Sequence, residues 1–508
     1  MIYTAEHVRR DRVLQADLCV IGSGAGGAPV AWEAARHGLR VVVLEAGSYL
    51  EPRHFTQIEY DMVQRLYHDG AARTTADRAI HVLQGKGVGG STLHNLNLCK
   101  RLPEEIAAQW FADHGLAPLQ GGTLPALFAE LEQLLGVSEL GPAQANANNR
   151  VLERGCRALG WRGGWLRHNR RGCVGAGFCE LGCPFDAKQN ALKVFIAEAV
   201  EAGALVLADT WAERLEHDRR RVRAVEAAVR DPRTGAVRHR VRIEARAVCA
   251  AASATGTPAL LLRSAVPDPY RLVGSRLFLH PGTAVAGIFA EPIHGWRGIP
   301  QSYECTEWLD LGPQSTRRVW IVPSFAHPAG AAATLGAFGA EHARLMRDYA
   351  HMAALSPMVH DLVPGRVRPR GRFGVAIEYR LDPSDAAQLR LGLVAAARLL
   401  FAAGARRVLV PASPALELAR EDEIEPVLGA LSLRPHTLDL TSVHPMSGCW
   451  MGDDPARACC EATGRYHHLD NLWVADTSLF PGSLGVPPQL TTYALGLHVG
   501  RCLLAALG

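Results

Sequence analysis

The stretch ADLCVIGSGAGGAPVAWEAARHGLRVVVLEAGSYL, residues 16–50, decides the fold. An apolar run, Leu18 to Ile21, leads into a glycine-rich turn and an alanine-rich helical pattern. A second apolar run, Val41 to Leu44, ends at Glu45. Strand, Gly-x-Gly-x-x-Gly turn, helix, strand and closing acid form the pattern of a βαβ unit that binds a dinucleotide. The sequence therefore predicts an α/β fold with a Rossmann-like domain.

Each feature of this turn has a predicted role. Gly22 allows the tight turn, Gly24 lets the backbone approach a pyrophosphate, and Gly27 lets helix and strand pack closely. The helix N-terminus offers free N–H groups and partial positive charge to phosphates. Glu45 stands where a carboxylate accepts hydrogen bonds from ribose hydroxyls. The alternative is a glycine-rich turn in an ordinary α/β unit.

Length and composition narrow the class of protein. The chain has 508 residues, 48% of them hydrophobic and 20% charged, which is typical of a soluble globular protein of two or more domains. The net charge of +4 is small and dispersed, so we expect no nucleic-acid partner. There is no run of ~18 apolar residues and no apolar leader, so we expect no membrane span and a cytoplasmic location. Twelve cysteines then favour thiols or metal ligands over disulfides.

Three further segments carry site-like patterns. The first is the glycine-rich loop GKGVGGSTLHN, residues 85–95, whose backbone can lie against a flat ring or a phosphate. The second is CAAASATGTPALLLRS, residues 249–264, a strand followed by a small-residue turn and a helix. The third comprises SVHPMSGCWMG, residues 442–452, and NLWVADTSLFPGSLGVPPQLTTYALG, residues 471–496. It combines a histidine, a carboxylate and a Pro-Gly loop before a helix.

With the βαβ unit, these segments resemble, in order, the glucose-methanol-choline (GMC) family of FAD-dependent alcohol oxidoreductases. The resemblance implies a Rossmann-like FAD domain formed by both chain ends, residues 1–284 and 436–508, plus a mixed α+β substrate domain at 285–435, where the match is weak. The insertion GCVGAGFCELGCPFDAKQN, within about residues 165–190, looks like the branch of long-chain alcohol oxidases and cholesterol-oxidase-like proteins.

The resemblance also implies a set of cofactor contacts. FAD is the expected cofactor, its ADP half held by the glycine turn and Glu45. The second glycine loop would lie along the flavin, and the C-terminal segment near the ribityl chain and pyrophosphate. One backbone position of the middle strands would contact the adenine. The residues are Gly22, Gly24, Gly27 and Glu45; Gly89, Gly90, His94 and Asn95; Asp476, Pro488 and Gln489; and Ala212.

His444 matches the family's catalytic histidine. A neutral imidazole can take the hydroxyl proton while the alcohol carbon gives a hydride to flavin N5; the alternative is a capped loop histidine. The family normally places a second His or Asn just before a proline, where this chain has Pro487. Either Gln489 or a residue from 285–435 polarises the alcohol oxygen, or His444 acts alone. Gln489 is alternatively a residue that only bonds backbone or flavin carbonyls.

Two further hypotheses concern bound groups. His94 occupies the position at which some family members attach FAD covalently; the alternative is a noncovalent contact or a packed loop histidine. Cys173, Cys179 and Cys183 give the spacing C-x5-C-x3-C-P, which resembles part of an iron–sulfur run. An all-cysteine cubane needs a fourth ligand, and Ala176 stands where relatives often have one. We keep an iron–sulfur cluster, another metal, and a reduced structural loop as alternatives.

The resulting hypothesis is FAD-dependent oxidation of an alcohol to an aldehyde or ketone. The apolar middle region favours a hydrophobic or aromatic alcohol over a sugar. Oxygen, a quinone or a cytochrome is the unidentified electron acceptor; a cluster would favour a dehydrogenase over an oxidase. The missing partner at Pro487 keeps open a redox-neutral lyase or isomerase of the same family. A noncatalytic electron-transfer flavoprotein is the other alternative.

Overall fold

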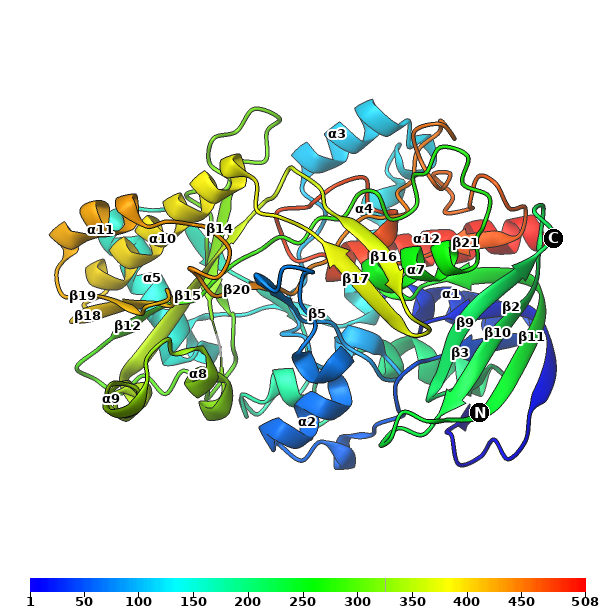
Figure 1. Ribbon diagram of the computed structural model, residues 1–508, viewed down its shortest axis with the longest axis horizontal. Coiled ribbons are helices and arrows are strands. Elements are labelled where there is room, and N and C mark those ends of the chain that lie inside the picture. The colour runs from blue at the N-terminus through cyan, green and yellow to red at the C-terminus, as the bar shows by residue number, and fades with distance from the viewer. Residues whose placement is uncertain (325) are drawn as a thin grey trace.

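The computed structural model describes residues 1–324 and 326–508 and contains two large sheets at opposite ends of its long axis (Figure 1). The first is a mixed sheet with a parallel centre. In spatial order it comprises β1 (Ile2–Tyr3), β8 (Leu205–Leu207), β3 (Val41–Leu44), β2 (Arg12–Ile21), β11 (Val237–Ala250), β10 (Val222–Arg230) and β9 (Thr210–His217). A further strand, β21 (Leu472–Val474), pairs with β11 in parallel. The α/β fold is confirmed, and a C-terminal strand completes the sheet that begins at the N-terminus.

Helices α1 (Gly27–Arg36) and α12 (Gln489–Leu507) pack together beside this sheet. Their approach depends on glycine, because a Cβ on Gly496 would overlap with the carbonyl oxygen of Gly26. A Cβ on Gly26 would likewise overlap with the carbonyl oxygen of Ala475. By length and composition α12 could cross a membrane, but 67% of its apolar window is buried inside the protein, as in a core helix.

The second sheet is antiparallel. Its order is β19 (Leu416–Leu418), β18 (Arg407–Val410), β12 (Val285–Ile288), β15 (Met352–Val359), β14 (Val319–Pro323), β13 (Tyr303–Cys305) and β6 (Gly163–Trp165). Helices α5 (Ala147–Leu159) and α10 (Pro383–Ala402) pack on it and on each other. A Cβ on Gly155 would lie 2.5 Å from the carbonyl oxygen of Leu399, so this crossing also needs glycine. Thus β6 and α5, although in the segment 1–284, belong to the second sheet's layer.

Short elements join the two layers. A parallel pair, β4 (Ile80–Val82) and β20 (Leu440–Ser442), brings the segment before His444 beside the strand before the second glycine loop. The hairpin β16 (Arg366–Arg370) and β17 (Gly374–Glu378) packs on α7 (Ser253–Arg263). The remaining helices and strands are α2 (Glu59–Leu66), α3 (Glu104–His114), α4 (Thr123–Leu134), α6 (Ala197–Glu201), α8 (Pro328–Thr334), α9 (Gly339–Arg347), α11 (Ile424–Ala430), β5 (Val137–Glu139) and β7 (Arg167–Asn169).

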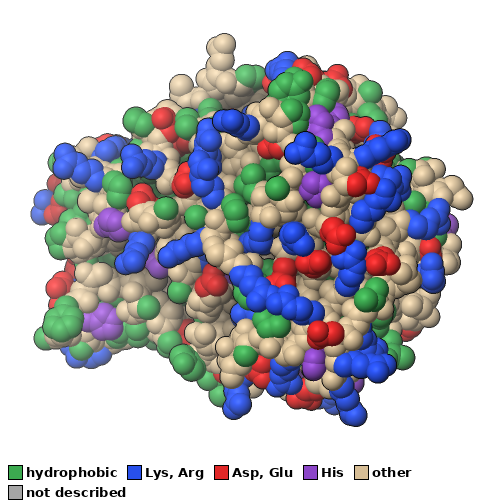
Figure 2. Space-filling view, turned by 45° about the vertical axis from the view of Figure 1, so that its right-hand side comes forward, with side chains coloured by type: hydrophobic (Ala, Val, Ile, Leu, Met, Phe, Trp, Pro, Cys, Tyr) green, Lys and Arg blue, Asp and Glu red, His purple; other side chains and the backbone are tan. Residues whose placement is uncertain are grey.

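Basic side chains on the face turned forward in Figure 2 are interleaved with acidic ones. Glu213 on β9 pairs with Arg240 on β11 and with Arg372 in the β16–β17 turn. Arg242 on β11 pairs with Glu216 on β9. Ion pairs at the surface add little to stability, about 0–1 kcal/mol each. Because of these pairs, the arginines in this region lie beside carboxylates and do not form a continuous basic surface.

Candidate active site

A cavity of about 1020 Å³ lies between the two layers and is lined by both. Its size exceeds the usual range for a single small ligand. Segments that are distant in the sequence meet in its wall: the two glycine loops, the start of α7, and the C-terminal loop before α12. Most of the predicted site residues line it, namely Gly22, Gly24, Glu45, Gly90, His94, Asn95, Ala212, His444, Asp476, Pro487, Pro488 and Gln489. Gly27 and Gly89 lie just outside the wall.

The two glycine loops touch at positions where no side chain fits. Gly22 has a φ of 106°, and a Cβ there would overlap with the carbonyl oxygen of Ala251. Gly90 has a φ of 57°, and its Cβ would lie 2.9 Å from the Cα of Gly24. Only glycine allows this approach. The cradle formed by the two glycine loops opens at the N-terminus of α1, so it fits the pyrophosphate of a dinucleotide.

Glu45 fastens both glycine loops to the end of β3. Its Oε2 accepts from the amide and hydroxyl of Ser23 at 3.1 and 2.7 Å. Its Oε1 accepts from the amides of Gly47 and Gly87 at 2.9 and 3.2 Å. Burial raises the pKa of Glu45, while these donors act in the opposite direction. A carboxylate has about four acceptor positions, so a ribose hydroxyl would have to replace the Ser23 hydroxyl. The ribose contact stays a prediction.

Asp476 and Ala212 lie at different parts of the cavity wall. The Asp476 carboxylate accepts from the Ser253 amide at 2.9 Å, the Thr257 hydroxyl at 2.6 Å and the Ser478 amide at 2.7 Å. It therefore ties the start of α7 to the C-terminal segment. Ala212 lies on β9, at the end of the cavity formed by the first sheet.

His94 lies in the wall between Tyr67, whose ring centroid is 4.1 Å away, and Gly85. Its Nε2 is buried and has no hydrogen-bond partner among the described residues. Burial, with the nearby Lys188 charge, lowers the pKa of His94 to about 3, so the imidazole is neutral. An uncharged ring with an unpartnered nitrogen can be a contact for a flavin or a site of attachment to it.

The cysteine-rich segment is joined to the His94 loop through Lys188. This buried ammonium donates to the carbonyls of Leu93, Asn95 and Cys179 at 3.0, 2.6 and 2.9 Å. Across residues 1–324 and 326–508, no group of three or more His, Cys, Asp or Glu is placed to hold a metal ion, and this includes Cys173, Cys179 and Cys183. The iron–sulfur cluster, another metal and the structural loop therefore all remain predictions for this segment.

His444 follows β20 and is partly exposed to the cavity. Its Nδ1 lies 3.0 Å from Nδ1 of His280, and the two rings stack with centroids 5.1 Å apart. Burial lowers the pKa of His444 to about 3. The imidazole is therefore neutral at ordinary pH, the form that a general base requires.

Gln489 is already engaged on the other side of the wall. Its Oε1 accepts from the amide of Asn95, and its Nε2 donates to the carbonyl of Leu98 at 3.1 Å and to Asn169 at 3.3 Å. These contacts support the anchoring alternative for Gln489. The side chain that does contact His444 is His280, which lies just before the 285–435 region and which sequence reasoning missed. Only its position before Pro281 at the start of a buried segment could have drawn notice.

The part of the cavity formed by the second sheet is apolar. A cluster of Ile288, Leu345, Met352 and Leu409 packs there, and the last three line the cavity. Trp296 and Tyr349 also line it, and their rings stack 4.5 Å apart at 11°. This part offers a molecule mainly hydrocarbon and aromatic surface.

Comparison with known families matches two models described as GMC oxidoreductase, over residues 63–282 and 364–496. A third model, an NAD(P)-binding Rossmann-like domain, matches residues 20–78. Together these matches include both glycine loops, the strand-turn-helix around α7 and the segment containing His444 and Gln489.

The similar proteins agree with the family models. An uncharacterized GMC-type oxidoreductase of Mycobacterium tuberculosis is 34% identical, over 96% of this chain and 75% of its own length. A long-chain-alcohol oxidase of Arabidopsis thaliana is 26% identical, over 97% and 69% respectively. Among solved structures, pyridoxine 4-oxidase from Mesorbium loti has a TM-score of 0.68 at 17% identity, covering 96% of this chain and 98% of its own.

Proposed function

Because the chain belongs to the GMC oxidoreductase family, whose members act on CH–OH donors with FAD, we propose that it oxidises hydrophobic alcohols to aldehydes or ketones with His444 as the base. The observation that carries the proposal is that one cavity contains the glycine-loop cradle, the neutral His444 and an apolar chamber, which is the part formed by the second sheet. The long-chain-alcohol oxidases among the similar proteins support the substrate class.

In this proposal, different groups of the chain bind FAD, take the proton and bind the substrate. Gly22, Gly24 and Gly90 would hold the pyrophosphate region of FAD, and Asn95 would lie along its ring. When bound, FAD accepts the hydride from the alcohol carbon. His444 takes the hydroxyl proton, which leaves the electron pair on oxygen and makes departure of hydride easier. The apolar chamber excludes water and binds the hydrocarbon part of the substrate.

The test is anaerobic reduction of the bound flavin by a series of straight-chain primary alcohols, followed by absorbance. Each buried methylene contributes about 0.8 kcal/mol, so the second-order rate constant should rise about fourfold per methylene until the chamber is full. His444→Ala should lower the rate constant for flavin reduction by about 100-fold or more, since general bases contribute about 10²–10⁴-fold.

A sugar that reduces the flavin better than any aliphatic or aromatic alcohol would contradict the substrate class. Lack of reduction by every alcohol would contradict alcohol oxidation and favour the redox-neutral lyase or isomerase. With a reducing alcohol identified, turnover with oxygen, with a soluble quinone and with a cytochrome distinguishes an oxidase from a dehydrogenase.

Within the same proposal, His94 is the residue to which FAD would be attached. Support comes from its neutral ring and its unpartnered Nε2 beside the second glycine loop. Acid precipitation should leave the yellow colour with the wild-type pellet and release it from His94→Gln. Release from the wild type as well would mean that the cofactor is held only by noncovalent contacts.

A further inference from the structure

We propose that His280 is the positioning partner of His444 and fixes the tautomer in which His444 Nε2 carries the lone pair. It would compensate for Pro487, whose side chain has neither donor nor acceptor. The inference rests on the proposed function, because it assumes an alcohol proton for His444 to take. It concerns an interaction between two residues of this chain, however, and that interaction can be measured without turnover.

The short distance between His280 and His444 requires a hydrogen bond between their rings. The Nδ1 atoms of His280 and His444 lie 3.0 Å apart, which is hydrogen-bond distance. Two nitrogens can approach in this way only when one carries a hydrogen and the other a lone pair. If His444 donates, its Nε2 is left with the lone pair. If His280 donates, neutral His444 carries its hydrogen on Nε2 and cannot accept a proton there.

The backbone at His280 is held in a strained shape that aims the ring. His280 is fully buried with a φ of 49°, in the left-handed region that most residues avoid. The Asp361 carboxylate accepts from the amides of Leu279 and His280 at 2.8 and 3.1 Å, and from the Tyr379 hydroxyl at 3.0 Å. The hydroxyl of Ser442, two residues before His444, donates to the Leu279 carbonyl at 2.5 Å. Local strain that the surroundings hold in place is typical of functional sites.

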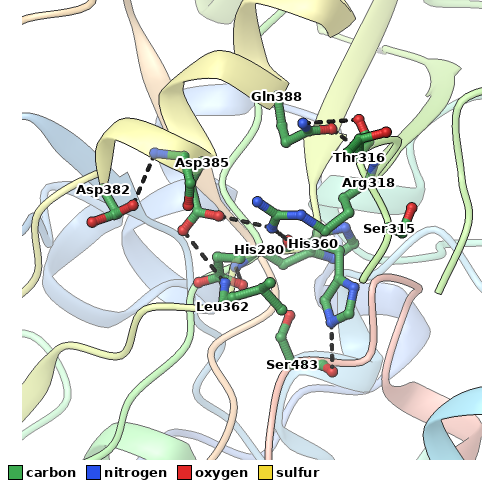
Figure 3. A network of polar contacts seen from close by, with 12 residues as sticks. His280, Ser315, Thr316, Arg318, His360, Leu362, Asp382, Asp385, Gln388 and Ser483 are labelled. Atoms are coloured by element: carbon green, nitrogen blue, oxygen red, sulfur yellow. Dashed lines mark hydrogen bonds and ion pairs between the residues drawn. The ribbon is translucent and has the colours of Figure 1, made fainter. Parts of the chain in front are cut away.

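His360 favours the productive proton placement. Its Nε2 lies 3.1 Å from the carbonyl oxygen of Ser483, which can only accept, so Nε2 carries the hydrogen and neutral His360 has its lone pair on Nδ1 (Figure 3). Burial and the Arg318 charge lower the pKa of His360 to about 4, which keeps it neutral. Arg318 in turn pairs with buried Asp385 at 2.8 Å.

Two buried nitrogens in this network have no partner among the described residues, Nε2 of His280 and Nδ1 of His360. The two rings are near neighbours, because a positive charge on His360 would lower the pKa of His280. If His280 carries its hydrogen on Nε2, that nitrogen is a donor and Nδ1 of His360 is an acceptor. If His280 carries its hydrogen on Nδ1 instead, both of the unpartnered nitrogens are acceptors. The first placement is electrostatically complementary. It makes His280 Nδ1 the acceptor and leaves the lone pair of His444 Nε2 facing the cavity.

With this placement of hydrogens, His444 can take up the proton that the alcohol loses. The alcohol O–H bond breaks, its electron pair stays on oxygen, and an N–H bond forms at His444 Nε2. The resulting imidazolium keeps its Nδ1–H bond to neutral His280, and hydrogen bonds to a charged donor are about twice as strong as neutral ones. His280 therefore supports the charged form that His444 adopts only during the reaction.

The experiment compares His280→Ala with His280→Asn in the holoenzyme. Asparagine tolerates a left-handed backbone, and its amide oxygen can accept from His444 Nδ1–H. We expect His280→Ala to lower the rate constant for flavin reduction by about 10- to 100-fold, as loss of an orienting partner typically does, and His280→Asn to restore most of it. The matched control is His436→Ala, an exposed histidine with a φ of 68°, which should leave the rate unchanged.

A readout independent of turnover is the ¹⁵N NMR spectrum of labelled histidines, with the His444 signals assigned from His444→Ala. Wild type and His280→Asn should show a hydrogen on His444 Nδ1, and His280→Ala a mixture of tautomers. Wild-type flavin reduction in His280→Ala with an unchanged tautomer would overturn the inference. If no alcohol reduces the flavin, the proposed function fails, and the tautomer shift still decides whether His280 positions His444.

Discussion

Two polar side chains that line the cavity with His444 are already engaged with other protein groups. Asp476 holds the start of α7, and Gln489 bonds Asn95, Leu98 and Asn169. Within the described part of the chain, His280 is the side chain that lies within hydrogen-bond distance of His444. The two histidines are 164 positions apart. The sequence shows which residue types are present, but a contact over that distance depends on how the two layers pack.

Gln489 offers a prediction at the scale of one residue. Gln489→Ala should lower the free energy of unfolding by about 1–3 kcal/mol, because it leaves buried partners such as the Leu98 carbonyl unpaired. The rate constant for flavin reduction should stay within about threefold of wild type. Urea unfolding and stopped-flow absorbance provide the two values. A fall of 100-fold in flavin reduction with unchanged stability would instead make Gln489 the group that polarises the alcohol.

At the scale of elements, local patterns predicted the first half of the site well. The strand, turn and helix of β2, α1 and β3 follow directly from apolar runs and glycines, which act over a few residues. The second layer was harder to predict, because β6 and α5 precede the Cys-rich segment in the sequence whereas the other strands of that layer follow it. Strand pairing between remote segments depends on matching surfaces, and single-sequence periodicity does not encode those pairs.

The loop joined by Lys188 gives a prediction for an element. Lys188→Met should lower the free energy of unfolding by about 3 kcal/mol, since it leaves three carbonyls without their donor and each buried unsatisfied group costs about 1–3 kcal/mol. The matched control is Lys193→Met, a surface lysine paired with Asp186, which should change stability by less than about 1 kcal/mol. Thermal unfolding measures both. Equal effects for the two variants would contradict a structural role for Lys188.

For the whole molecule, buried titratable groups determine how stability depends on pH. Burial lowers the pKa of His360 to about 4 from its ordinary 6.5, so the unfolded chain binds this proton more readily. The contribution of His360 is therefore fully present above pH 6.5 and is lost as the pH falls through 4. His94 and His444, with pKa values of about 3, act in the same direction. Asp361, whose burial raises its pKa to about 6, acts in the opposite direction.

A variant isolates one of these contributions. Between pH 6.5 and 4.5, His360→Gln should lose about 2 kcal/mol less free energy of unfolding than wild type, because one depressed pKa contributes about 1.4 kcal/mol per pH unit. Urea titrations at several pH values give this difference directly. Parallel curves for the two proteins would mean that His360 binds its proton equally well in both states.

Strand β21 also determines when the protein can fold during synthesis. Its residue Leu472 pairs with Val248, so the edge of β11 at Val248–Ala250 stays open while residues 251–471, which include most of the second layer, are being made. At roughly 5–20 residues per second, that interval lasts roughly 10–45 s. During this time the nascent chain exposes an apolar, unpaired strand edge, and such edges promote aggregation. The cofactor cradle, whose Gly26 packs against Ala475, is completed only afterwards. The nascent chain therefore exposes this sheet edge before it has a complete site for FAD.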